Sequence, residues 1–295
     1  MKVFRWLLFI AFMVLVLGFL AKSKLEDFKL DQPQMFSEPV TDQFAPALPE
    51  SITARQSAAN ILVFSKTHGY RHHDAINAAN AMFTSIAEQQ DWSLVHTENA
   101  AIFASELLAY FDVVVWNNAT GPLLTSQQRQ AFKEFLEQGG GFVGIHAAGD
   151  ASHSDWQWYQ QQVIRANFTG HPMFPQFQSA VLSFEKNSHH PAIRHFNRSM
   201  NHIDEWYCFE HSPREKVNVL AVIDEQGMNF MALNSRDKLS FGNLAMGDDH
   251  PVIWSHQQGS GRVFYSALGH RAESYQVPDF ITMHEQAVIW AGRLQ

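Results

Sequence analysis

Short apolar segments separated by amphipathic stretches run along the chain from about residue 60 onward. Residues 72–90 and 125–138 place apolar side chains on one helical face, and three glycines at 139–141 end the second of these helices. Four short apolar segments predict strands buried within a sheet: 61–64, 93–96, 112–116 and 142–145. Strands that alternate with helices predict a parallel sheet with helices on both faces.

The second half of the chain is richer in predicted strands and closes with a helix. The strand candidates are 180–184, 203–206, 217–223, 252–255 and 262–267. Residues 279–293 form the predicted closing helix, whose inner face carries four apolar residues: Phe280, Met283, Ala287 and Trp290. We therefore expect an α/β three-layer sandwich with a mostly parallel central sheet, contained in one domain over residues 58–295.

The first residues have the pattern of a targeting segment. Residues 6–21 are sixteen uncharged and mostly apolar residues, with Lys2 and Arg5 before them and two lysines after them. This length lies between that of a secretory signal and that of a membrane-spanning helix. We predict that residues 1–24 form a signal-anchor or a cleaved signal peptide, and that residues 25–57, with four prolines, form an extended linker. The domain is therefore expected to be exported, either anchored in the inner membrane facing the periplasm or secreted to the periplasm.

Charge and cysteine content exclude several classes of protein. The net charge is −8, and without residues 1–24, which hold four basic residues, it becomes −12 (21 − 4 = 17 basic against 29 acidic). Such an acidic body is unsuited to binding a nucleic acid and better suited to a neutral substrate. The single cysteine, Cys208, cannot form an internal disulfide or a cysteine-built zinc site. The 16 histidines all lie at residue 68 or later, so proton transfer and metal binding become the chemistry to consider.

Polar, titratable segments follow four of the predicted strands: 66–74, 117–121, 146–150 and 268–275. Ligands bind beyond the carboxyl ends of the strands in an open parallel sheet. The four segments together therefore predict a site at one edge of the sheet, although each alone could be an ordinary solvated loop.

Residues 144–148, Gly-Ile-His-Ala-Ala, have the layout of a nucleophile elbow, in which small neighbours let one side chain stand at a strand-to-helix corner. Here that side chain is His146, which can act as a general base, a hydrogen-bond donor or a metal ligand. The alternative is a buried structural histidine under the sheet edge.

Several motifs, in order along the chain, resemble the ThuA-like (trehalose utilisation) family. They are FSKTHGYRH at 64–72, GGGFVGIH at 139–146, GHP at 170–172, DEWY at 204–207, MGDDHP at 246–251, ALGH at 267–270 and ESY at 273–275. The resemblance covers residues 58–295 and implies a flavodoxin-like, class I glutamine amidotransferase-like fold. In amidotransferases the elbow residue is a cysteine, so His146 at this position argues against a thiol amidase. The family is linked to disaccharide catabolism with oxidised (3-keto) sugars, which implies a small carbohydrate as the partner.

Roles can be suggested for individual residues of this site. His146, Glu205 and His270 are predicted to be catalytic, and the aromatic neighbours of Glu205 suggest a raised pKa suited to an acid or base. Nine residues are predicted to bind substrate: Lys66, Tyr70, Arg71, His72, Asn117, Thr120, His171, Trp206 and Glu273. A zinc ion is compatible with His146, His171 and His270, although no spacing requires one. Four histidines without a strand-end position are predicted to lie at the surface: His189, His190, His195 and His211.

Two classes of function follow from these patterns. The first is an enzyme that performs hydrolysis, elimination or isomerisation by acid–base chemistry on a disaccharide or 3-keto-glycoside. The second is a non-catalytic sugar-binding or scaffolding module, because fold alone does not determine function. A metal-dependent hydrolase is a third alternative, and no pattern in the chain predicts an oligomeric state.

Overall fold

The computed structural model describes residues 32–185, 188–234 and 240–295. The chain divides into two compact units, Met1–Glu38 and Pro39–Gln295. The described part of the first unit contains a short 3₁₀ helix, η1 (Pro33–Phe36). The predicted targeting segment 1–24 lies outside the described residues, and within them no helix has the length and apolar character needed to cross a membrane.

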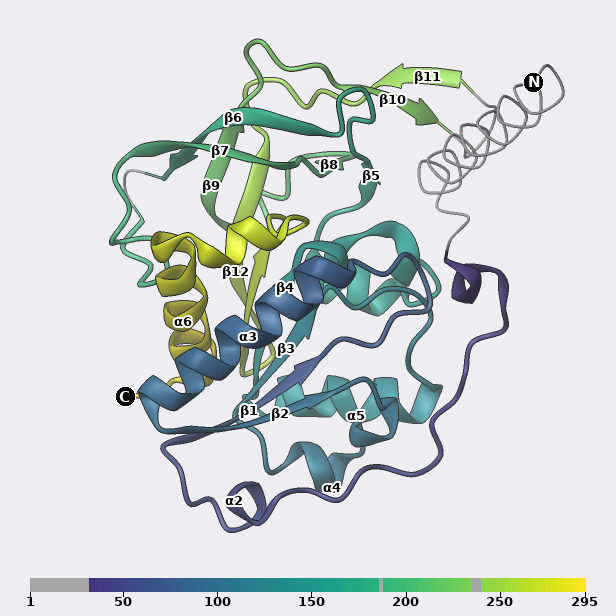
Figure 1. Cartoon of the computed structure of the whole chain (residues 1–295), viewed down its shortest axis with the longest axis vertical. Helices are drawn as coiled ribbons and strands as arrows, with labels where there is room; N and C mark the ends of the chain where they lie inside the picture. Colours follow the sequence, from purple (N-terminus) through teal and green to yellow (C-terminus); the bar gives the residue numbers. More distant parts are fainter. Residues whose placement is uncertain (1–31, 186–187, 235–239) are drawn as a thin grey trace, which may run out of the picture. The chain divides into compact units, whose positions relative to one another are not determined.

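The second unit is organised around a nine-stranded sheet with the order β2-β1-β3-β4-β13-β12-β9-β6-β7 (Figure 1). Five neighbouring strands are parallel: β2 (Trp92–Thr97), β1 (Ala59–Phe64), β3 (Val113–Asn117), β4 (Gly141–Ile145) and β13 (Gly261–Ser266). Four strands extend the sheet in antiparallel fashion: β12 (Pro251–Gln258), β9 (Asn218–Asp224), β6 (Phe177–Phe184) and β7 (Ser199–Glu205). These nine strands correspond to the nine predicted ones. Two short antiparallel pairs were not predicted: β5 (Phe168–Gly170) with β8 (Cys208–Phe209), and β10 (Met231–Asn234) with β11 (Ser240–Asn243).

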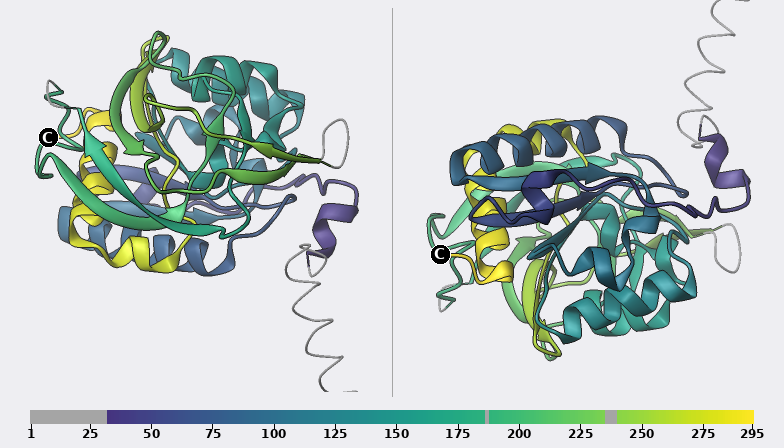
Figure 2. Two further views of the ribbon diagram at one scale, coloured as in Figure 1. Left: turned by 90° about the horizontal axis from the view of Figure 1, so that it is seen from above. Right: turned by 90° about the horizontal axis from the view of Figure 1, so that it is seen from below.

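Helices cover both faces of the parallel strands, as the views along the sheet show (Figure 2). Two adjacent residues of β3 illustrate the arrangement, because successive strand residues point to opposite faces. The ring of Trp116 stacks on Phe132 of α5 (Ser126–Glu137), with centroids 5.7 Å apart, whereas Asn117 donates to the carbonyl of Ile76 in α3 (His73–Gln90). The closing helix α6 (Pro278–Gly292) packs with α3. The α/β fold with a mostly parallel central sheet is confirmed.

Local sequence explains where the second predicted helix begins and ends. Thr125 caps α5 by accepting from the Gln128 amide at 3.3 Å, and the Gln128 side chain accepts from the Thr125 amide at 2.8 Å. At the other end Gly139 has φ +111°, a conformation that favours glycine. Gly140 then packs so closely on Phe135 that a Cβ would lie 2.3 Å from its ring. The glycine run therefore both ends the helix and lets β4 start beneath it.

The remaining short helices are α2 (Glu50–Thr53), η2 (Ala100–Ile102), α4 (Ser105–Leu108), η3 (His146–Gly149), η4 (Ala151–His153), η5 (Tyr159–Ile164, a π-helix) and η6 (Ala272–Gln276). The region predicted as a linker contributes α2, and from residue 39 on it contacts the sheet domain. Asn60 donates to the carbonyl of Ile52, and Asn99 donates to that of Phe44. This part of the region is therefore fixed to the domain.

His190, His256 and His284 are buried, so the prediction that His190 is a surface residue is wrong. The His190 ring is 7% exposed and lies 4.4 Å from the ring of Trp290, which is only half-buried on α6. His256 donates to the carbonyl of Val163 and His284 to that of Phe280. Burial lowers the pKa of each of these three histidines to about 4.

These core histidines predict a loss of stability in acid. An unfolded histidine has a pKa of about 6.5, so between roughly pH 6.5 and pH 4 the unfolded chain binds protons that the folded chain does not. The free energy of unfolding should therefore fall over this window as the pH falls, by about 2 kcal/mol per histidine at about pH 5. Denaturant unfolding at about pH 7.5 and pH 5 should show a smaller pH difference for His284→Leu than for the wild type. An equal difference for the two proteins would contradict a neutral, buried His284.

Candidate active site

Four of the predicted site residues meet at the carboxyl ends of the strands. His72 precedes α3, His146 follows β4, His270 follows β13, and Glu205 is the last residue of β7. Each offers one potential ligand atom, and these four atoms all lie within 4.8 Å of one another. Every member except His270 is buried. We refer to these four residues as the histidine–glutamate cluster.

The antiparallel half of the sheet has to curve to bring Glu205 into this cluster. β7 is four strands away from β13, a distance of about 19 Å in a flat sheet with strands about 4.8 Å apart. Nevertheless, Glu205 Oε2 lies 3.3 Å from His146 Nε2 and 3.2 Å from His270 Nδ1. The twist and curvature of strands β12 to β7 therefore fold the end of β7 back over the parallel strands.

Three atoms of the cluster form a nearly equilateral triangle. Its edges join His146 Nε2 to His270 Nδ1 at 3.3 Å, and each of these nitrogens to Glu205 Oε2 at 3.3 and 3.2 Å. Atoms that bind one zinc ion tetrahedrally at about 2.0–2.1 Å are themselves roughly 3.3 Å apart. Imidazole and carboxylate donors suit first-row divalent cations. The three residues, with His72 as a fourth donor, therefore have the composition and spacing of a metal-binding site.

His146 stands at the predicted strand-to-helix corner, in a constrained backbone conformation. Its φ is +47°, in the left-handed region that is costly for residues other than glycine. Its Nδ1–H donates to the carbonyl of Ala267 at 2.7 Å, and its own carbonyl accepts from the Tyr265 hydroxyl at 2.8 Å. Nε2 therefore faces the cluster. Metal-binding histidines commonly have this arrangement, with the second ring nitrogen donating to a carbonyl.

The pKa of Glu205 differs from the one expected from the sequence. Burial alone would raise its pKa, but the charge of His171 and the hydrogen bonds of His146 and His270 hold the pKa well below its usual value. The expectation of a raised pKa is therefore wrong. The sequence shows only the aromatic neighbours of Glu205, whereas in the folded chain three imidazoles surround its carboxylate. Conversely, burial would lower the pKa of His146, but Glu205 raises it. At neutral pH Glu205 is an anion, which suits a metal ligand better than a proton donor.

Comparison with known proteins identifies the family of the chain. A family model described as trehalose utilisation matches residues 60–291, most of the chain. The chain belongs to the ThuA family. No curated protein matches it.

Solved structures share the ThuA fold at low sequence identity. A ThuA-like protein of Bacteroides uniformis ATCC 8492 is 21% identical with a TM-score of 0.64, covering 84% of this chain and 95% of its own. Another from Parabacteroides merdae ATCC 43184 is 15% identical with a TM-score of 0.58, covering 79% and 90%. A cytoplasmic protein of Salmonella typhimurium LT2 is 12% identical with a TM-score of 0.51, covering 79% and 99%. These likenesses support the fold of the ThuA domain.

Asp204 organises the turn that carries His270, a role that sequence reasoning did not assign. Its buried carboxylate accepts from the backbone amides of Gly269 at 2.8 Å, His270 at 3.2 Å and Glu205 at 2.9 Å. The Ser274 hydroxyl donates to the same carboxylate at 3.3 Å. Asp204 therefore joins the end of β7 to the loop after β13. Asp204 is the first residue of the DEWY motif, so that motif could have pointed to it.

Two further predicted residues lie beside the cluster. His171 Nδ1 is 3.1 Å from the other carboxylate oxygen of Glu205, Oε1, and 3.0 Å from the Pro172 carbonyl. His171 therefore contacts Oε1 of Glu205, whereas the triangle contains Oε2. The third histidine of the potential metal site is His72, in place of the predicted His171. The Tyr70 ring lies 4.8 Å from that of His72.

Two residues near Glu205 were not predicted. Gln176 donates to Glu205 Oε1 at 2.5 Å, and the Tyr207 ring lies 4.1 Å from that of His146. His250, in the quoted MGDDHP motif, donates to the Tyr207 carbonyl at 2.8 Å and thereby fixes the backbone of Tyr207. Tyr207 belongs to the DEWY motif, whereas nothing in the local sequence singled out Gln176.

Four predicted substrate-binding residues make contacts within the protein. The Lys66 amine pairs with Asp42 and donates to the Val40 carbonyl at 2.8 Å. Arg71 pairs with Glu98 at 2.6 Å. Asn117 is fully buried and bonded to α3, and the Thr120 hydroxyl donates to the Tyr70 carbonyl at 3.0 Å. Their partners come from distant segments, which explains why sequence position alone suggested a different role.

Trp206 and Glu273 do not belong to the cluster. Trp206 is fully buried and donates its indole N–H to the Gln178 carbonyl at 2.8 Å, so it presents no face on which a sugar could stack. Glu273 is 66% exposed and pairs with Arg271 at 3.1 Å. His270 precedes η6, so the two residues do not share a helical face.

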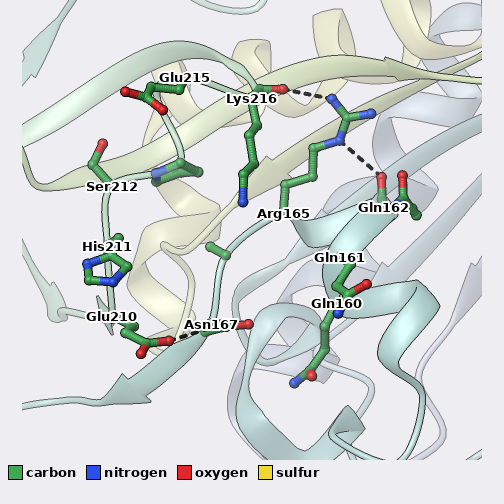
Figure 3. A pocket seen from close by; sticks show the side chains of 12 residues that line it. Gln160, Gln161, Gln162, Arg165, Asn167, Glu210, His211, Ser212, Glu215 and Lys216 are labelled. Carbon is green, nitrogen blue, oxygen red and sulfur yellow. Dashed lines mark hydrogen bonds between the residues drawn. The ribbon is translucent and has the colours of Figure 1, made fainter.

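A large cavity of about 710 Å³ lies elsewhere, between residues 160–167 and 210–216 (Figure 3). Arg165 crosses one side of it and donates to the carbonyls of Gln162 and Lys216, and Asn167 donates to Glu210. These bonds tie two loops together and leave a polar, solvated hollow. Its lining residues do not include the histidine–glutamate cluster, so cavity size does not identify the site in this ThuA domain.

Proposed function

We propose that this ThuA protein is a divalent-metal-dependent enzyme that performs acid–base chemistry on an oxidised (3-keto) glycoside. The supporting observation is the triangle of His146 Nε2, His270 Nδ1 and Glu205 Oε2, with edges of 3.2–3.3 Å, buried at the carboxyl edge of the sheet. Family membership, described as trehalose utilisation, supports a carbohydrate as the substrate class. The acidic chain suits a neutral sugar.

The three atoms of the triangle, with His72, would hold the cation. A bound divalent ion would stabilise negative charge that develops on a carbonyl oxygen of the sugar. Ala267 orients His146, and the amide of His270 is held by Asp204. Such outer contacts fix the direction of metal-binding nitrogens.

His171 is the side chain best placed to move a proton. Both atoms near its Nδ1, Glu205 Oε1 and the Pro172 carbonyl, are acceptors, so Nδ1 keeps its proton and proton exchange would take place at Nε2. A histidine oriented by a carboxylate in this way resembles the base of a catalytic triad. His146 is fully buried with both nitrogens directed to protein groups, so we assign proton transfer to His171 rather than to His146.

The proposed reaction is elimination from the 3-keto-glycoside. His171 takes the proton from the carbon between the ketone and the anomeric centre, and the C–H electron pair forms an enolate. The enolate re-forms the ketone, a double bond forms between the deprotonated carbon and the anomeric carbon, and the glycosidic C–O bond breaks. Protonated His171 then gives its proton to the leaving oxygen. Export by residues 1–24 would place this reaction in the periplasm, with the unit that begins at Pro39 as the catalytic domain.

The expected result is metal-dependent turnover of 3-keto-trehalose. Protein stripped of metal should be inactive, and one equivalent of zinc, manganese or cobalt per chain should restore activity, because the cluster supplies a single ligand set. Product formation by NMR and metal content by elemental analysis test this. Equal turnover by stripped and reloaded protein would refute the metal requirement, and no turnover with any of these ions would refute the proposed reaction.

A further inference from the structure

A second hollow lies next to the histidine–glutamate cluster, on the side of His270. It measures about 310 Å³ and is formed by β6, β7 and η6. Its lining residues are Ser179, Asn201, His202, Ile203, Arg271, Glu273, Ser274 and Val277. We call it the Arg271 groove. Its volume is at the lower end of the range for small-molecule sites, which is roughly 300–1,000 Å³.

Phe177 stands between the cluster and the groove. Its ring centroid is 5.1 Å from that of His270, and the Arg271 guanidinium lies 5.7 Å from the same ring. The preceding residue, Gln176, donates to Glu205. Phe177 nevertheless remains 40% exposed. A ligand that reaches His270 from solvent would therefore meet Phe177 and Arg271 next.

The groove combines apolar and polar surfaces in the way that a sugar ring requires. Ile203, 45% exposed, and Phe177 offer apolar area for the C–H face of a ring. Arg271 offers several N–H donors in one plane, and Glu273 offers acceptors. Because Arg271 and Glu273 pair at 3.1 Å, their charges offset each other. This balance suits a neutral polyol better than an ionic ligand.

We propose that the Arg271 groove binds the second ring of a disaccharide whose first ring reacts at the histidine–glutamate cluster. This inference rests on the proposed function and adds the place where the leaving sugar binds. Phe177 would stack on the second ring, and Arg271 and Glu273 would bind its hydroxyls. It also gives Glu273, which lines the groove, a place in substrate binding.

The Phe177→Ala variant tests the binding of the second ring separately from that of the first. We expect this variant to lower kcat/KM for 3-keto-trehalose at least tenfold while leaving kcat/KM for a methyl 3-keto-glucoside within twofold, because the methyl compound has no second ring. Val181→Ala is the matched control, since Val181 is 39% exposed on the same strand β6. The control should leave both substrates unchanged. Equal losses on the two substrates, or none on either, would overturn the inference.

A binding measurement keeps the inference testable if the proposed reaction fails. By calorimetry, zinc-loaded wild type should bind unoxidised trehalose at least tenfold more tightly than methyl glucoside, and Phe177→Ala should remove this preference. Arg271→Met, which keeps the apolar stem and removes the donors, should weaken trehalose binding in the same direction. Absence of the preference in the wild type would overturn the second-ring site, whereas its presence without turnover would refute only the proposed reaction.

Discussion

Replacing Glu205 by glutamine should lower turnover of the 3-keto-glycoside by about 10³-fold, the effect expected when one partner of a buried charged cluster is removed. Glutamine has nearly the same shape, so the change removes a negative charge and puts an N–H₂ group where an acceptor is needed. Oε1 and Oε2 of Glu205 lie 3.1–3.3 Å from nitrogens of His171, His146 and His270. Three imidazoles would therefore lose their common anion, and a bound cation would lose its only carboxylate ligand among these residues.

The measurement pairs turnover with metal content. Zinc bound per chain in Glu205→Gln should fall well below that of the wild type at the same free zinc concentration. Glu210→Gln provides the control, since Glu210 is an exposed carboxylate that accepts from Asn167 at 3.0 Å. A Glu205→Gln protein with normal turnover would show that Glu205 takes part neither in metal binding nor in catalysis.

Replacing Asp204 by asparagine should affect both stability and the site. The carboxylate accepts from three backbone amides and from Ser274. Burial alone would raise its pKa, but the hydrogen bond of His202, the charge of His146 and the Gly269 amide hold the pKa below its usual value. Asparagine has one acceptor atom and a donor group, so it cannot satisfy the amides of Gly269 and His270 in the same way. We expect a loss of about 3–5 kcal/mol in the free energy of unfolding, the range for breaking a buried charged arrangement.

A purely structural Asp204 and a positioning Asp204 give different results. If Asp204 places His270, zinc affinity of Asp204→Asn should fall at least tenfold under conditions where the variant is fully folded, because metal sites depend on the groups that orient their ligands. Competition with a coloured chelator measures this affinity, and circular dichroism verifies folding. Unchanged zinc affinity in the folded variant would restrict the role of Asp204 to stability.

Much of the fold was predictable because the central strands are buried on both faces and therefore appear as short apolar segments. The same rule placed His146, His72 and His270 at one sheet edge, since parallel strands end together. Glu205 was named as a candidate, but its contact with His146 depends on the curvature of four antiparallel strands, which no local pattern encodes. Its low pKa follows from that contact.

The wrong or incomplete expectations have equally specific causes. Neighbouring aromatic residues Trp206 and Tyr207 have different surroundings: the first donates to the Gln178 carbonyl in the core and the second lies on His146. Their order in the sequence could not decide which one meets the site. Lys66 and Arg71 looked available for substrate because their partners, Asp42 and Glu98, come from separate segments of the chain.

The central claim is that one divalent cation binds between His146, His270 and Glu205. Anomalous diffraction at the zinc absorption edge, from crystals of the zinc-loaded protein, tests it most directly. The account predicts one strong anomalous peak at about 2.0–2.2 Å from His146 Nε2, His270 Nδ1 and a Glu205 oxygen. A zinc-loaded crystal whose anomalous peaks all lie away from these three atoms would contradict it.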